Sequence, residues 1–156
     1  MTDWIKVRAN EVRRVENEKK LERERQIVAA NELKAKTEPF WQELQRTLDL
    51  SIKEFNTEFS EIERRIDQFE KSAVALTIRR TSYPAATVKA SFNTAGTSIQ
   101  YSISVTHRKG GNPTEKQSTF AVGVANGEAG YSGNGVASHD DVAKVFLDPF
   151  FEFSTG

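Results

Sequence analysis

Residues 41–76 read WQELQRTLDLSIKEFNTEFSEIERRIDQFEKSAVAL. Apolar side chains recur in this stretch at alternating steps of three and four residues. A seven-residue repeat of this kind is typical of an amphipathic or coiled-coil helix, because positions three and four apart share one helix face. The repeat is carried by Ile52, Phe55, Phe59, Ile62, Ile66, Phe69, Ala73 and Leu76, with Trp41, Leu44 and Leu48 upstream. The stretch therefore predicts a long helix, and its bulky phenylalanines favour packing on a sheet over a narrow two-stranded seam.

Pro39 is the first proline of the chain, and it lies inside an otherwise helical pattern. Thr37 can cap a helix that starts there. Proline suits the first helical turn, because a backbone N–H at that position would have no partner within the helix. We therefore predict two helices, 3–36 and 38–72, with a kink or a hairpin near Pro39. Residues 1–36 hold 10 basic and 7 acidic side chains, whereas residues 37–71 hold 5 and 9, so the two segments have complementary charge.

The second half of the chain has a different composition. All nine glycines lie from Gly96 onward, and residues 72–156 hold only 7 basic and 6 acidic side chains. Apolar and polar residues alternate there between turn signals, which is typical of antiparallel strands with one buried face. The apolar positions are Val88, Ala90 and Phe92, then Ile99, Tyr101, Ile103 and Val105, then Phe120, Val122 and Val124, with a short last strand at 128–132. Residues 73–80 fit either helix or strand.

The chain ends with a second helix signal. Ser138 is a suitable N-cap, and Asp140 and Asp141 favour a first helical turn. The apolar side of this helix consists of Val142, Val145, Phe146 and Phe150, and Pro149 bends or ends it. The predicted fold class is therefore α+β. A long helical arm (1–72, its second helix packing on the sheet) precedes a three- or four-stranded antiparallel meander with a C-terminal helix (73–156), all in one structural domain.

The predicted lengths point to a partner. A helix of about 35 residues spans roughly 50 Å, but strands of about seven residues reach only roughly 25 Å. The apolar stripe would then outrun the sheet, so a second copy or another protein would cover the excess. The residues expected to bind this partner are Trp41, Leu44, Leu48 and Ile52, together with Ile27, Val28 and Leu33 of the first helix.

No catalytic, cofactor-binding or metal-binding residues are predicted. The chain has no cysteine, which excludes thiolate chemistry and disulfides. Its two histidines, His107 and His139, lie at a strand end and at the predicted helix start, and neither forms a recognisable metal or triad motif. The 22 basic side chains equal the 22 acidic ones, so no net charge draws the chain to nucleic acid or to a membrane.

The sequence thus favours a non-enzymatic, cytoplasmic interaction or assembly protein that self-associates or binds a partner through its long helices. The alternative is a small-ligand or lipid-binding module with an apolar pocket between the sheet and the helices. Such a pocket would be lined by Phe55, Phe59, Phe69, Phe92, Tyr101 and Phe120. An enzyme is the third class, and it would require a buried cluster that contains His107 or His139 together with an acid partner.

Overall fold

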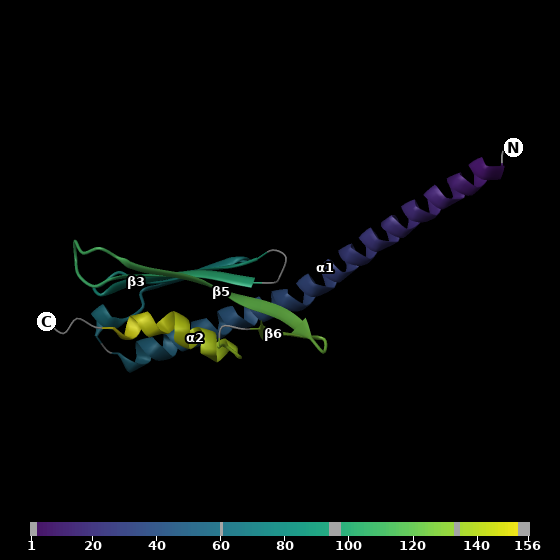
Figure 1. Cartoon of the computed structure of the whole chain (residues 1–156). Coiled ribbons are helices and arrows are strands. Elements are labelled where there is room, and N and C mark those ends of the chain that lie inside the picture. Colours follow the sequence, from purple (N-terminus) through teal and green to yellow (C-terminus); the bar gives the residue numbers. More distant parts are fainter. Residues whose placement is uncertain (1–2, 60, 94–97, 133–134, 153–156) are drawn as a thin grey trace.

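The computed structural model describes residues 3–59, 61–93, 98–132 and 135–152. One long helix comes first, six strands follow, and a short helix closes the chain (Figure 1). The elements are α1 (Asp3–Glu58), η1 (Ile62–Arg64), β1 (Gln68–Lys71), β2 (Ala75–Arg80), β3 (Ala85–Phe92), β4 (Ser98–Thr106), β5 (Thr114–Ala125), β6 (Glu128–Ser132), α2 (His139–Leu147) and η2 (Asp148–Phe151).

The first half is one helix, so the prediction of two helices with a kink or hairpin near Pro39 was wrong. α1 continues through Pro39. Thr37 does not cap a new helix, because its hydroxyl donates to the carbonyl of Leu33 (2.9 Å) inside α1. A proline inside a helix costs about 3 kcal/mol. Burial of Thr37, Trp41 and the apolar residues beyond them offsets that cost, and local sequence signals cannot show this.

The seven-residue repeat also ends earlier than predicted. α1 stops at Glu58. The side chain of Asn56 makes two hydrogen bonds with the backbone of Ile66: its Nδ2 donates to the carbonyl (3.0 Å), and its Oδ1 accepts from the amide (2.8 Å). Phe69 lies in β1 and Leu76 in β2. The helical spacing from Phe59 onward is therefore coincidental.

The sheet has six strands in the order β1-β2-β3-β4-β5-β6, and every neighbouring pair is antiparallel. The predicted meander of three or four strands was too small, because β1 lies in the segment taken for helix and residues 73–80 contribute β2. The prediction of one apolar and one polar face is confirmed by alternating burial along β2, β3 and β4.

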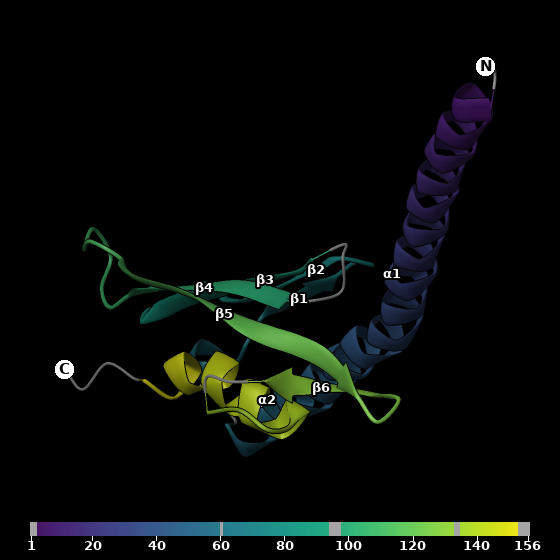
Figure 2. The same cartoon turned by 45° about the vertical axis from the view of Figure 1, so that its right-hand side comes forward.

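The second part of α1 and the whole of α2 lie against the inner face of the sheet (Figures 1 and 2). Ser138 caps α2 as predicted, since its Oγ accepts from the amide of Asp141 (3.2 Å). Val142, Phe146 and Phe150 are fully buried in the same core as Trp41 and Leu48. We call the described residues from 37 to 152 the body, and residues 3–36 of α1 the arm.

The apolar stripe of α1 is covered by the body itself. Trp41, Leu44, Leu48 and Ile52 all lie in the core, and none is more than 6% exposed. The stripe ends near Phe55, so it spans only about 15 residues or roughly 22 Å, which the sheet and α2 can cover. The expected mismatch between a long stripe and a short sheet therefore does not exist.

Candidate interaction surface on the helical arm

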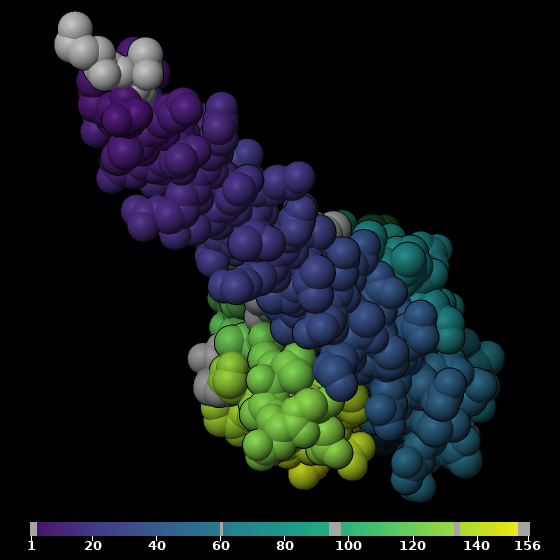
Figure 3. Space-filling view, turned by 90° about the vertical axis from the view of Figure 1, so that its right-hand side faces the viewer, coloured from purple at the N-terminus to yellow at the C-terminus, as the bar shows by residue number. Residues whose placement is uncertain are grey.

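The arm projects away from the body as a single helix (Figures 1 and 3). Almost all its side chains are solvent-exposed, and the large apolar ones include Trp4 (69% exposed) and Ile27 (60%). Helices in proteins owe most of their stability to an apolar face packed on something else. The exposed apolar side chains of the arm are Trp4, Ile5, Val7, Val12, Val15, Leu21, Ile27 and Val28. The arm is thus the largest uncovered element among the described residues.

Charged side chains on the arm pair along the helix itself. Arg8 lies 3.8 Å from Glu11, and Arg14 lies 4.0 Å from Glu18. These pairs are open to solvent and contribute at most a few tenths of a kcal/mol each. They support the helix but do not cover its apolar residues.

The root of the arm is tied to the sheet. The ammonium group of Lys36 donates to the carbonyl of Gly127 (2.7 Å) in the turn between β5 and β6. Asn126 and Gly127 both have positive φ, at 53° and 78°, which fits a tight hairpin at this Asn-Gly pair. An Asn-Gly pair is a turn signal in the sequence itself, whereas the contact of this turn with the helix is visible only in the structure.

The residues predicted to bind a partner fall into two groups. Trp41, Leu44, Leu48 and Ile52 are buried in the body, where another molecule cannot reach them without unfolding it. Ile27 and Val28 are exposed on the arm, and Leu33 is half-buried near its root. The structure does not bring the two groups together. Of the residues predicted to bind a partner, only those on the arm are accessible.

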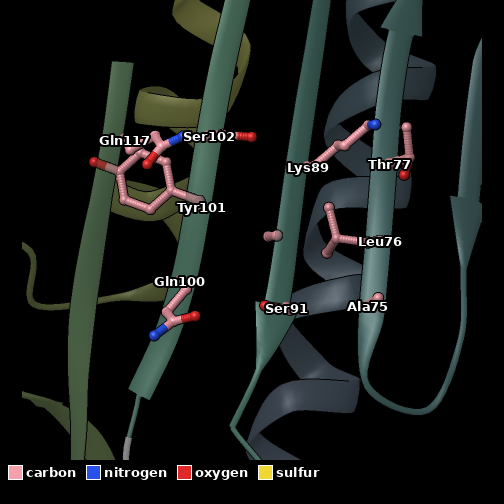
Figure 4. Close-up of a pocket in the computed structure, with 10 residues that line it drawn as sticks. Ala75, Leu76, Thr77, Lys89, Ser91, Gln100, Tyr101, Ser102 and Gln117 are labelled. Carbon is pink, nitrogen blue, oxygen red and sulfur yellow. The ribbon is translucent and has the colours of Figure 1, made fainter. Parts of the chain in front are cut away.

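Aromatic rings pack together over most of the space where a ligand pocket was considered, and a hollow of about 370 Å³ remains beside Phe55, Phe59 and Phe151 at the end of α1. Trp41 stacks on Phe92 with ring centroids 5.4 Å apart, and Tyr101 stacks on Phe120 at 4.7 Å. A depression of about 360 Å³ lies on the sheet and is lined by Thr77, Lys89, Ser91, Gln100, Ser102 and Gln117, among others (Figure 4). These side chains belong to the polar outer face and not to the layer between sheet and helices. Together with Ala75, Leu76, Ala90 and Tyr101, they line a shallow, open depression whose surface is more apolar than polar.

The two histidines lie in different surroundings. His107 Nδ1 is 3.8 Å from a carboxylate oxygen of Glu152, and both side chains are more than half exposed, so they form no buried cluster. His139 Nδ1 lies 2.7 Å from the hydroxyl of Tyr131, and the ring of Phe40 packs 4.4 Å from the imidazole. Asp141 instead completes the helix cap, because its Oδ2 accepts from the amide of Ala137 (2.9 Å). Within the described ranges no three His, Asp or Glu side chains gather as metal ligands.

Stability should fall as the pH drops below neutrality because of His139. Burial lowers the pKa of His139, although the carboxylates of Glu43 and Asp140 oppose the shift. A histidine with a lowered pKa in the folded state takes up its proton more readily when unfolded. The free energy of unfolding should therefore decrease as the pH falls through about 6.5.

Denaturation at pH 7.5 and at pH 5.5 would measure this effect, with His139→Asn as the comparison. Asparagine keeps a polar atom near the Tyr131 hydroxyl but does not titrate, so the loss of stability on acidification should be smaller in that variant. An equal loss in both proteins would contradict the assignment.

The fold is an α+β sandwich of one antiparallel sheet and two helices, with a single long helix projecting from it. Neither helix of the described chain contains an apolar run of the length needed to cross a membrane. No known protein family, curated protein or solved structure matches the chain. Its function is therefore inferred from its own residues.

Proposed function

We propose that this chain is an interaction protein that assembles, with itself or with another protein, through the arm of α1. One observation supports this most directly. A helix of roughly 50 Å carries exposed large apolar side chains from Trp4 to Val28, and nothing in the described chain covers them. Ordering such a helix costs conformational entropy that exposed ion pairs do not repay. A bound partner would supply the missing apolar contacts.

The body serves as a rigid base in this proposal. Its apolar residues pack together without a partner, and the arm continues the same helix out of this core, with Lys36 bonded to the turn between β5 and β6. The packed rings between sheet and helices favour this function over a ligand-binding pocket.

Removal of the arm tests the proposal. A variant lacking residues 2–32 keeps Leu33, Lys36 and all buried residues, so its body should retain the thermal stability of the full chain. Sedimentation equilibrium at high micromolar concentration should show the full chain above its monomer mass of 17.5 kDa and the shortened chain as a monomer.

The shortened variant is its own folding control, because its far-ultraviolet circular dichroism should keep the sheet signal. The proposal would be refuted if the full chain is monomeric and binds no other protein through residues 2–32. It would also be refuted if the shortened chain associates as strongly as the full one.

A further inference from the structure

The arm carries a second repeat of three- and four-residue steps, different from the one buried in the body. It runs from Ile5 to Leu33, and all its members except the half-buried Leu33 are exposed. The positions are Ile5, Arg8, Val12, Val15, Lys19, Glu22, Gln26, Ala29 and Leu33. Five of the nine positions are apolar, Arg8 and Gln26 are polar, and Lys19 and Glu22 near the middle are a cation and an anion. Polar residues in the middle of an apolar seam are a common device for fixing how two helices align.

We propose that two copies of this chain pair through their arms in an antiparallel coiled coil, with Lys19 of each copy opposite Glu22 of the other. This inference rests on the proposed function and names the partner as a second copy. The pair covers Ile5, Val12 and Val15 of the exposed apolar side chains, whereas Leu21, Ile27 and Val28 lie outside the seam. In this alignment the residue numbers of any two facing seam positions, one from each copy, add up to 41. Val12 therefore faces Ala29 of the second copy. A two-fold axis near residues 20 and 21 makes every contact occur twice.

The residues that flank the seam favour the same alignment. Glu16 then lies beside Arg23 of the second copy, and Glu18 lies beside Arg25. Together with the Lys19–Glu22 contacts, symmetry gives six pairs of opposite charge around the centre. The one like-charge contact, Glu11 with Glu32, lies toward the ends of the pair, where solvent screens it most.

Other alignments are less favourable. A parallel pair in register would place Lys19 against Lys19 and Glu22 against Glu22. An antiparallel pair shifted by one heptad would place Val12 against Glu22 in one direction, or Lys19 against Ala29 in the other. In each alternative the repulsion or the charge–apolar contact falls near the middle of the pair. The proposed alignment also brings Arg8 against Leu33, but toward the ends of the pair, where the guanidinium can reach solvent.

The length of the arm agrees independently with the charges. Uncovered helix runs from Asp3 to Lys36, and Thr37 is the first fully buried residue of α1. In the proposed alignment Ile5 faces the backbone position of Lys36 in the second copy, one step beyond the last seam residue, where the ammonium group is bonded to Gly127 of its own chain. Each arm therefore ends where the other copy's body begins, and the two arms overlap along their whole exposed length. The two bodies lie at opposite ends of a closed dimer.

Disulfide trapping tests the alignment, because the chain has no cysteine of its own. Val12→Cys and Ala29→Cys are made in separate full-length chains and mixed before mild oxidation. The mixture should give a disulfide-linked dimer containing one chain of each kind, and neither variant alone should give one. Self-linked dimers of each variant would show a parallel pair and overturn the proposal, as would an associated mixture that never cross-links.

Charge reversal gives a second, independent test by sedimentation. Lys19→Glu and Glu22→Lys should each weaken self-association about tenfold or more, since each creates two like-charge contacts near the axis. The double variant Lys19→Glu/Glu22→Lys should restore it. The matched control, Lys20→Glu with Glu24→Lys, changes neighbouring charges that point away from the seam and should leave association unchanged.

The outcomes separate this inference from the broader function. If association depends on the arm but is unchanged by charge reversal at residues 19 and 22, the antiparallel pair is refuted and the interaction function stands. A full chain that stays monomeric and binds no protein through its arm would overturn both.

Discussion

Replacing Arg80 by leucine should lower the free energy of unfolding by about 3–5 kcal/mol, because several buried carbonyl groups lose their donor at once. Arg80 is 1% exposed. Its guanidinium donates to the carbonyls of Pro84 (3.0 Å), Arg64 (3.1 Å), Phe150 (2.7 Å) and Glu152 (2.9 Å). One side chain in β2 thereby joins the segment after α1 to the end of the described chain.

The electrostatic environment of Arg80 explains why the residue is tolerated in the core. Burial lowers the pKa of Arg80, and the nearby carboxylates of Asp67 and Glu152 oppose that shift. Leucine fills a similar volume along the stem but cannot bond the carbonyls. The guanidinium lies 5.8 Å from the ring centroid of Phe150, so the variant also loses a cation–π contact.

Urea denaturation followed by circular dichroism would measure the effect, and Arg79→Leu is the matched control. Arg79 is the preceding residue in β2 and points to the exposed outer face, so its replacement should change stability by about 0.5 kcal/mol or less. Similar stabilities for the two variants would show that the carbonyl contacts of Arg80 contribute little.

Truncating Leu48 to alanine should cost about 2–5 kcal/mol of stability, because it opens a cavity in a packed core. Leu48 is 0% exposed and lies in the same cluster as Trp41, Leu44 and Phe146. The loss should be independent of protein concentration, since the side chain is covered by its own chain. Thermal unfolding at several concentrations would measure both quantities.

Leu50→Ala provides the comparison two residues away on the same helix. Leu50 is 61% exposed, so its truncation should change stability by less than about 0.5 kcal/mol. If Leu48→Ala were as mild as Leu50→Ala, or harmful only at low protein concentration, the burial of the α1 stripe within one molecule would be wrong.

Predictions from the sequence were most accurate where the structure depends on residues that are close neighbours along the chain. Alternation in β3 and β4 indicated which residues face inward, and Ser138 with Asp141 marked the start of α2. These signals depend on neighbours within a few residues, and the structure keeps them. The exposed apolar residues Ile27 and Val28 on the arm were also visible as candidates in the sequence.

Predictions failed where distant contacts outweigh local preference. Thr37 and Pro39 read as a helix start, yet burial of the residues beyond them keeps α1 continuous. The spacing from Phe59 to Leu76 fits a helix, but the pairing of Phe69 with Ile78 makes strands there. Helix propensities differ by about 1 kcal/mol or less per residue for ordinary side chains. Burial of one large apolar side chain contributes a larger free energy, about 1.5–3 kcal/mol.

By itself the sequence determined the α+β class, the apolar face of the sheet, the closing helix and the absence of cysteine chemistry. The tertiary structure alone decided that α1 is unbroken, that its central stripe is covered by the chain itself, and that most of the exposed large apolar side chains of α1 lie on the arm. The physical reason is that local patterns specify which face of an element is apolar, whereas only the assembled fold determines what covers it.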